Sequence, residues 1–400
     1  MSSMAKSKKQ LHIAMFPWLA FGHILPAFEL AKIIAQKGHF VTFISTPRNI
    51  NRLPKFPPHL NPFLNLVGLP FLPEHKANLP ENAESTMDIP SNELHYLQMA
   101  YEGLQESLAE LLKITNPNWI FYDINAPFVP PIANTLHIPC VYFLVCPAWN
   151  ICFLDTTPNR NWIKILLFSG QSLKISLDLP KNQVTQALSV FKWDKAISGC
   201  DLFALRSCPE LESEWLNLLS ELHNKPVLPV GLIPPSLQVG MVDDEDNNPV
   251  QVSSADLPNE FEDRTKDRGL VCREWVPQLK ILEHESVGAY FTHCGGGSVL
   301  EGLNFGHVLI TLPYIFDQSL YARVLEEKKL GVEIPRNDQD GSFTRTSVAN
   351  SVRLAMVDEE GSTYRENAKQ MGLVVSDKSR HDRYIDNFIE YLQNYKKAQS

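Results

Sequence analysis

The segment over residues 293–301 holds side chains whose types and order could bind a phosphate-bearing ligand. A glycine-rich turn over residues 293–297 follows a short apolar run and leads into Ser298 and Glu301. Glycines let backbone amides approach a ligand closely, and a helix start attracts anions because its free amides and its dipole face the same way. His293 and Ser298 could donate hydrogen bonds to phosphate oxygens. Glu301, one helical turn further on, could accept hydrogen bonds from ribose hydroxyls.

Further polar and aromatic residues lie on both sides of this turn. Trp275 could stack on a base, although a lone tryptophan is more often a core residue. Asp317 and Gln318 follow an apolar run over residues 308–312, and ligands of open α/β sheets bind where the strands reach their carboxyl ends. An aspartate and a glutamine can grip sugar hydroxyls there. Each feature is weak alone, but the ordered set predicts a pocket for a sugar nucleotide.

The glycine-rich turn could instead belong to a metal site or to a nicotinamide or flavin site. His293 beside Cys294 could suggest a metal, but no second Cys or His stands at ligand spacing. The glycines do not form the G-x-G-x-x-G pattern of nicotinamide or flavin sites, because Leu300 occupies the place of the third glycine. We therefore expect no metal and no resident cofactor, and a nicotinamide oxidoreductase is not supported.

A histidine and an aspartate far apart in the sequence could form an acid–base pair. His23 ends the loop over residues 17–23, which follows an apolar run over residues 11–16, and Asp123 follows the run over residues 119–122. Both lie at the carboxyl ends of expected strands, which face the cleft of a doubly wound sheet. An imidazole can take a proton from a hydroxyl near neutral pH, and a carboxylate can fix its tautomer. Taken alone, however, His23 is more readily explained as a surface or helix-start histidine.

These side chains need a parallel α/β framework to come together, and the apolar pattern predicts one. A strand over 11–16, a helix over 25–37 and a strand over 40–45 form a βαβ unit, which implies parallel pairing. The other expected elements are buried strands over 119–122, 141–145, 201–205, 288–292 and 308–312, helices over 94–112 and 383–399, and a helix capped by Ser298. The predicted class is α/β with doubly wound domains.

Length and composition limit the class of protein further. Four hundred residues suit two domains of ordinary size, and a net charge of −9 gives no electrostatic reason to bind nucleic acid. The seven cysteines form no C-x-x-C pair, which suits a reducing compartment. The first apolar run is too short for a signal-peptide core, and no stretch approaches the ~20 apolar residues of a membrane span. We expect a cytoplasmic monomer that binds small molecules.

The ordered set over residues 275–318 resembles the signature box of the plant family 1 UDP-glycosyltransferases, enzymes with the GT-B fold. The resemblance implies two Rossmann-like doubly wound domains facing a cleft, with a UDP-sugar as co-substrate and no metal. It also implies a role for each matching residue. Trp275 would stack on uracil, Gln278 would reach the uridine, His293 and Ser298 would bind the diphosphate, Glu301 the ribose, and Asp317 with Gln318 the sugar.

One part of the box departs from the family's pattern. The common form is His-Cys-Gly-Trp-Asn-Ser, whereas here Gly295 is followed by Gly296 and Gly297, so two donor-binding side chains are reduced to backbone. The branch that adds sugars to existing glycosides sometimes carries small residues there. The loop that ends at His23 is similar to the family's catalytic loop, which implies that His23 is the base and that Asp123 is its activating partner.

The resemblance implies an inverting transfer of a sugar from a UDP-sugar to a hydroxyl of a plant secondary metabolite. The glycoside-extending branch, with its glucosyl- and rhamnosyltransferases, implies a flavonoid or terpenoid acceptor that already carries a sugar. The donor sugar could be glucose, rhamnose or xylose, and Gln318 mildly favours glucose.

The second domain is predicted to be incomplete. Relatives open it with a strand, a helix and a second strand, but only 21 residues stand between Pro235 and Leu257 here, and a βαβ unit takes about 30 or more. The predicted organisation is an acceptor-binding domain over 1–236, an acidic linker over 237–256, a truncated donor-binding domain over 257–380, and a C-terminal helix over 381–400 that packs back on the first domain. The alternative function is a weak or inactive isoform that keeps only a small-molecule-binding cleft.

Overall fold

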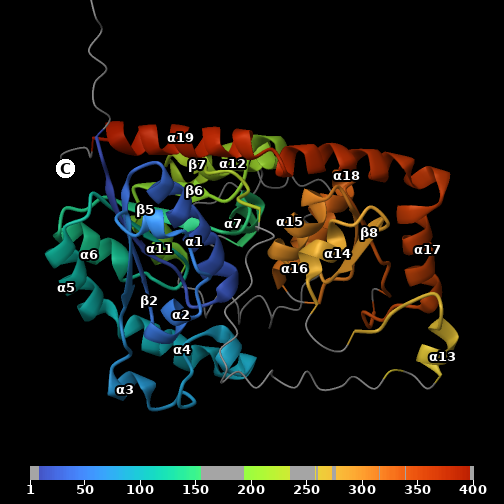
Figure 1. Cartoon of the computed structure of the whole chain (residues 1–400), viewed down its shortest axis with the longest axis horizontal. Helices are drawn as coiled ribbons and strands as arrows, with labels where there is room; N and C mark the ends of the chain where they lie inside the picture. The colour runs from blue at the N-terminus through green and yellow to red at the C-terminus, as the bar shows by residue number, and fades with distance from the viewer. Residues whose placement is uncertain are drawn as a thin grey trace, which may run out of the picture.

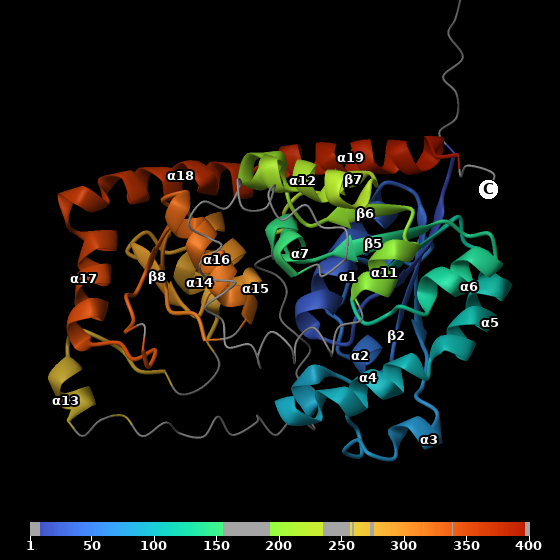
Figure 2. The same ribbon diagram turned by 180° about the vertical axis from the view of Figure 1, so that it is seen from behind.

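The computed structural model consists of two α/β units that are joined along one edge by the last two helices (Figures 1 and 2). The structure describes residues 9–154, 193–234, 257, 260–272, 276–314, 316–337 and 339–396. The predicted linker over 237–256 and the predicted uracil-stacking residue Trp275 therefore lie outside the described residues. In both views α18 (Ser362–Val375) and α19 (Lys378–Asn394) lie end to end, from the second unit to the first.

The first unit is built on a parallel sheet that has seven strands in the described residues. Their order across the sheet is β3-β2-β1-β4-β5-β6-β7, and every pairing is parallel. The strands are β1 (His12–Phe16), β2 (Phe40–Ser45), β3 (Leu64–Gly68), β4 (Trp119–Tyr122), β5 (Cys140–Leu144), β6 (Leu202–Leu205) and β7 (Val227–Pro229). The strand order reverses between β1 and β4, so their carboxyl ends form the switch point where doubly wound sheets bind ligands.

Helices cover both faces of this sheet, because successive residues of a strand point to opposite sides. Phe121 lies in a core with buried residues of α1 (Phe21–Gln36) and α19, while Tyr122 lies in the core on the opposite face of the sheet. The remaining helices of this unit are α2 (Pro47–Asn51), α3 (Pro73–Lys76), α4 (Leu94–Glu102), α5 (Gln105–Thr115), α6 (Val129–Thr135), α7 (Ala148–Leu154), α11 (Trp193–Gly199) and α12 (Pro209–His223), with short 3-10 helices η1 (Pro58–Leu60), η2 (Thr86–Asp88) and η3 (Ser91–Glu93).

One predicted helix of the first unit is wrong. The segment over 94–112 forms two helices, α4 and α5, which are separated at Gly103. A side chain at Gly103 would collide with the ring of His75 in α3. The glycine at the break thus leaves room for His75, a tertiary contact that the helical periodicity of the sequence does not reveal.

The second unit is smaller, and its described strands form a parallel three-stranded sheet in the order β10-β9-β8. Its elements are β8 (Ala289–Thr292), β9 (Val308–Thr311), β10 (Gly331–Glu333), α13 (Phe261–Thr265), α14 (Gln278–Leu282), α15 (Gly296–Asn304), α16 (Phe316–Glu327), α17 (Arg345–Met356) and η4 (Glu359–Gly361). The prediction that the strand over 288–292 is buried is wrong. Since β8 lies at an edge of the described sheet, Phe291 remains 50% exposed.

The last helix ties the two units together. Asp377 caps α19 by accepting a hydrogen bond from Arg380 N at 3.0 Å, so the helix starts and ends earlier than the predicted 383–399. Its apolar face enters the core of the first unit, where the ring of Phe388 lies 5.7 Å from that of Phe121. The chain thus returns to the first sheet after completing the second unit.

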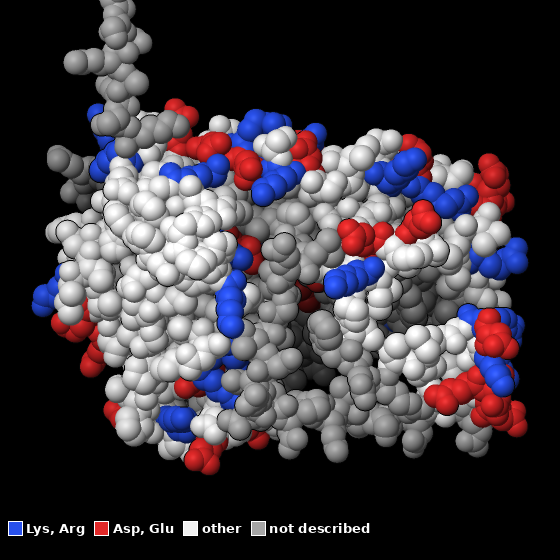
Figure 3. Space-filling model, viewed as in Figure 1, with Lys and Arg blue, Asp and Glu red and all other residues white. Residues whose placement is uncertain are grey.

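The helices and the surface charge of the described residues bear on membrane spans and on polyanions. No described helix combines the length and the apolar character that crossing a bilayer requires. On the face in Figure 3, Lys and Arg side chains are interspersed with Asp and Glu side chains, and the surface is hollowed between the two units. That face therefore offers no continuous positive field to a polyanion.

Candidate active site

The switch point of the first sheet brings His23 and Asp123 together. Nδ1 of His23 lies 2.5 Å from Oδ2 of Asp123, and the other carboxylate oxygen accepts a hydrogen bond from Ile124 N at 2.7 Å. Asp123 is 1% exposed, whereas the His23 side chain is 20% exposed. The buried carboxylate therefore holds one imidazole nitrogen, and the partly exposed ring can offer its other nitrogen to a ligand.

The loop that carries His23 is shorter than the sequence predicted. α1 begins at Phe21 rather than at residue 25, so His23 lies in the first turn of the helix. Its backbone N–H donates to Ala20 O at 2.8 Å, and Trp18 N–H points to the same Asp123 oxygen at 3.4 Å. The loop and the imidazole are thus both bound to the end of β4.

In the second unit, β8 leads through a tight turn into α15. Cys294 is buried with a positive φ of 72°, and Gly295 is the N-cap of the helix. The prediction that Ser298 caps this helix is wrong, because the helix begins at Gly296 and places Ser298 within the first turn. A glycine N-cap has no side chain to bind the first amides of the helix. These amides can therefore bind an anion at the helix start.

The two glycines that depart from the family's pattern have different surroundings. A Cβ at Gly296 would lie 2.5 Å from the hydroxyl of Tyr321 in α16, whereas a Cβ at Gly297 would meet nothing within 4 Å. The buried Tyr321 ring also contacts the ring of Trp149 in α7, with centroids 5.6 Å apart. Tyr321 thus occupies the space beside Gly296 and joins the two units, a role that its position in an ordinary helical pattern did not indicate.

Glu301 and Gln278 are brought together on facing helices. Nε2 of Gln278, at the start of α14, donates a hydrogen bond to the carboxylate of Glu301 in α15. Burial raises the pKa of Glu301, while the bond from Gln278 and the charge of Arg206 act in the opposite direction. Arg206, at the end of β6, is itself fixed by donating to Leu232 O and Ile233 O, both at 2.8 Å. The sequence analysis did not identify Arg206, since nothing local distinguishes it.

Asp317 and Gln318 lie at the start of α16. Oε1 of Gln318 accepts from Tyr314 N at 2.9 Å, which fixes this buried side chain against the preceding loop. Burial raises the pKa of Asp317, and a backbone hydrogen bond and the positive charges of His23 and His293 oppose the rise. Asp317 therefore lies near both histidines, one from each unit, which brings the start of α16 toward the His23–Asp123 pair.

His293 itself is exposed beside the turn. A Cβ at Gly295 would lie 2.7 Å from its Nε2, so the imidazole lies close over the N-cap of α15. Among the described residues, no group of three or more His, Cys, Asp or Glu side chains is arranged to hold a metal ion.

A doubly wound unit with a His–Asp pair at its switch point, facing a second parallel unit with an anion-binding turn, defines the GT-B class of glycosyltransferases. Solved structures support this fold. Glycyrrhiza uralensis UGT73P12, complexed with glycyrrhetinic acid 3-O-monoglucuronide, matches with a TM-score of 0.74 at 19% identity, covering 96% of each chain. Arabidopsis thaliana UGT89C1, complexed with UDP-L-rhamnose, matches with a TM-score of 0.70 at 20% identity, covering 96% of this chain and 100% of that one.

The chain belongs to the plant family 1 UDP-glycosyltransferases. It is 45% identical to soyasaponin III rhamnosyltransferase of Glycine max, over 97% of this chain and 96% of that protein. It is 37% identical to UDP-glycosyltransferase 91A1 of Arabidopsis thaliana, over 96% of this chain and 97% of that protein. Residues 256–399 match the family described as UDP-glucoronosyl and UDP-glucosyl transferase. The predicted family, fold class and enzyme class are thus confirmed.

The alignment with the Glycine max enzyme is longer than this chain. It spans 457 positions, although this chain has 400 residues. The relative therefore has residues that have no counterpart here.

Proposed function

We propose that this enzyme transfers a sugar, with inversion, from a UDP-sugar to a hydroxyl of a flavonoid or terpenoid that already carries a sugar. The observation that carries the proposal is the His23–Asp123 pair, in which Nδ1 lies 2.5 Å from Oδ2 at the switch point of the first sheet. Two similar proteins support the acceptor class. One is named for a soyasaponin, and the other was solved with a monoglucuronide.

In the proposed reaction, Asp123 fixes the Nδ1–H of His23, and Nε2 takes the proton of the acceptor hydroxyl. The acceptor oxygen forms a bond to the anomeric carbon while the bond from that carbon to the UDP oxygen breaks, and UDP leaves with the electron pair. A single displacement of this kind inverts the anomeric configuration. Asp123 also stabilises the imidazolium that results.

The donor side needs no metal in this proposal. His293, Ser298 and the free amides at the start of α15, including those of Gly296 and Gly297, bind the diphosphate, where the helix dipole favours negative charge. Glu301 and Gln278 bind the uridine after exchanging their mutual hydrogen bond for bonds to the ligand. Trp275 stacks on uracil, and Asp317 with Gln318 binds the sugar.

The acceptor assignment is tested by product formation. A flavonoid or triterpene glucoside and its aglycone are compared under the same UDP-sugar, with UDP-glucose and UDP-rhamnose as the first donors. We expect a higher kcat/KM for the glucoside. A preference for the aglycone rejects the glycoside-extending assignment, but it leaves the transferase reaction in place.

The second candidate function is a weakly active or inactive form with a reduced donor unit. Three observations favour it: β8 is an edge of the described second sheet, Phe291 on that strand is half exposed, and the Glycine max relative has residues that are lacking here. A parallel strand is normally buried on both faces and paired on both sides inside a sheet. We propose that the missing residues are the first strand–helix–strand segment of the donor unit.

The cellular setting is also a proposal. All seven cysteines are unpaired with one another, and five of them are buried. Cysteines that form no disulfide suit a reducing compartment such as the cytoplasm. We propose a cytoplasmic monomer, which size-exclusion chromatography with light scattering would test by its mass.

A further inference from the structure

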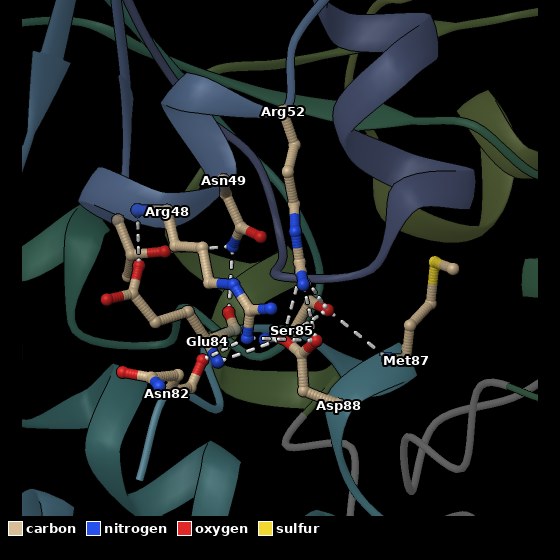
Figure 4. Close-up of polar contacts among 9 residues, drawn as sticks. Arg48, Asn49, Arg52, Asn82, Glu84, Ser85, Met87 and Asp88 are labelled. Atoms are coloured by element: carbon tan, nitrogen blue, oxygen red, sulfur yellow. Dashed lines mark hydrogen bonds and ion pairs between the residues drawn. The ribbon is translucent and has the colours of Figure 1, made fainter. Parts of the chain in front are cut away.

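A largely buried polar network surrounds Arg52 and Asp88 (Figure 4), and a backbone hydrogen bond from Thr86 connects it to the loop that carries His23. At its centre, Nη1 and Nη2 of Arg52 donate to the two carboxylate oxygens of Asp88 at 3.0 and 2.8 Å. Arg52 is 6% exposed, and its neighbour Ser85 is fully buried. A bidentate pair of this type fixes direction as well as distance. The segment over residues 82–88 and Arg52 are called the clasp below.

Asp88 also binds the segment that carries it. Its Oδ2 also accepts from Ser85 N and Ser85 Oγ at 2.8 Å and from Glu84 N at 3.0 Å. Burial alone would raise the pKa of Asp88, but the hydrogen bonds from Arg52, Glu84 and Ser85 and the charge of Arg52 hold that pKa below its usual value. The lowered pKa favours the carboxylate form, which the pairing with Arg52 requires.

The clasp is anchored to α2, which directly follows β2. Asn49 Nδ2 donates to Glu84 O at 2.7 Å, and Arg48 N donates to the Glu84 carboxylate at 2.7 Å. Arg48 Nη1 reaches Asn82 O at 2.6 Å. The segment over 82–88 is thus fixed to a helix whose own position is set by the sheet.

The other side of the clasp touches the loop of His23. Thr86 N donates to Leu19 O at 3.0 Å. The guanidinium of Arg52 lies 6.0 Å from the centre of the ring of Phe21, which is the first residue of α1. Leu19 and Phe21 are both buried. Since Trp18 N–H points to Asp123 on the opposite side, the loop is held between the buried aspartate and the clasp.

We propose that Arg52 and Asp88 are positioning residues for the base. They hold Leu19 and Phe21 so that His23, two residues further on, keeps its 2.5 Å contact with Asp123. Stability alone does not explain a buried ion pair, because apolar residues of similar volume often stabilise a protein as well. The inference rests on the proposed role of His23 in sugar transfer.

The test uses Asp88→Asn, with Asp386→Asn as the matched control. Asp386 pairs with Lys37 at 2.7 Å on the exposed side of α19, remote from the loop. We expect Asp88→Asn to lower kcat about tenfold to a hundredfold, since small displacements of a catalytic group cost that much. The KM for the UDP-sugar should stay unchanged, because the donor residues lie in the other unit. The control should change neither quantity.

A second readout makes the test independent of turnover. The Nδ1 proton of His23, in its short bond to Asp123, should give a downfield proton NMR signal, which is assigned by its loss in His23→Gln. Asp88→Asn should shift or broaden this signal, and Asp386→Asn should not. If the wild-type chain turns over no UDP-sugar, the proposed function fails, but this signal still tests the clasp.

If Asp88→Asn does not fold, Arg52→Lys replaces it, because lysine keeps the charge but loses the bidentate geometry. The same decrease in kcat and the same change in the signal are expected. The proposal is overturned if the folded variant lowers only the melting temperature and leaves kcat and the His23 signal like those of the control.

Discussion

The two units differ in how completely their sites are formed before a ligand arrives. In the first, a fully buried Asp123 already holds His23 at 2.5 Å, at the switch point of a seven-stranded sheet. In the second, His293 is exposed, and Gln278 and Glu301 are bound to each other rather than poised for a ligand. On the proposed roles of these residues, the acceptor side is preorganised, whereas the donor side must rearrange when it binds a UDP-sugar.

On the same proposed roles, this difference predicts which measured quantity each unit controls. A preorganised base requires no rearrangement at the moment of reaction. Donor binding, in contrast, must break the Gln278–Glu301 hydrogen bond and relies on a sheet whose described edge strand, β8, leaves Phe291 half exposed. We expect substitutions in the first unit to change kcat, and changes in the second unit to alter UDP affinity and stability.

The largest effect is expected at the base. His23→Ala should lower turnover by about 10² to 10⁴, the usual contribution of general-base catalysis. UDP affinity measured by calorimetry should barely change, since His23 belongs to the other unit. His59→Ala, at an exposed histidine of the same unit, is the control. A variant that keeps most of its turnover would show that His23 is not the base, and it would contradict a preorganised catalytic site in the first unit.

The next effect concerns packing at the start of α15. Gly296→Trp restores the family's residue, but it should destabilise the chain by about 1–3 kcal/mol, because its Cβ would lie 2.5 Å from the Tyr321 hydroxyl. Gly297→Asn faces open space and should stay within about 0.5 kcal/mol of the wild type. Urea denaturation measures both, and Tyr321→Ala should rescue part of the loss. Equal costs at 296 and 297 would show that Tyr321 does not set this turn.

A smaller effect should appear in the pH dependence of stability. Burial raises the pKa of Glu212, a residue of α12 that accepts from Trp149 N at 3.4 Å, from 4.5 to about 7. The folded chain thus holds a proton that the unfolded chain releases, so this stabilisation is complete below pH 4.5 and is lost as the pH rises through 7. Glu212→Gln should lose less stability than the wild type between about pH 5 and pH 8. Parallel curves would contradict the raised pKa.

The central strands of the first unit could be predicted because they are continuous buried apolar runs, whereas the less buried edge strands β3 and β7 were not predicted. The expected strand over 40–45 matches β2, and that over 119–122 matches β4. The predicted cap at Ser298 was wrong for a local reason, because Gly295 is the N-cap and the helix begins at Gly296. The predicted helix over 94–112 was wrong because it breaks at Gly103, beside His75, a neighbour through space. Local patterns carry periodicity, but they do not carry such neighbours.

Some residues of the candidate site could likewise be predicted from the sequence, and others could not. His23 and Asp123 were paired from their positions after two strands, and the structure brings them into contact. Arg206, Tyr321 and the clasp were missed, because each acts through partners distant in sequence. Arg206, for example, is fixed by the carbonyls of Leu232 and Ile233.

The smallest expected effect is that of metal removal. Since the helix start, His293 and Ser298 are proposed to bind the diphosphate alone, dialysis against EDTA should leave kcat unchanged, and added Mg²⁺ should not raise it. Manganese serves as a second ion in the same assay. A loss of turnover that a divalent ion restores would assign the diphosphate charge to a metal.

The most direct test of the contrast between the units is a calorimetric titration with UDP. It compares the chain as it stands with a variant that carries a relative's strand–helix–strand segment between Asp246 and Val252. A restored contact to the charged diphosphate is worth about 1.5–3 kcal/mol, so the graft should bind UDP at least about tenfold more tightly. Equal affinity in the two proteins, with turnover that already matches full-length relatives, would contradict the account of a reduced donor unit.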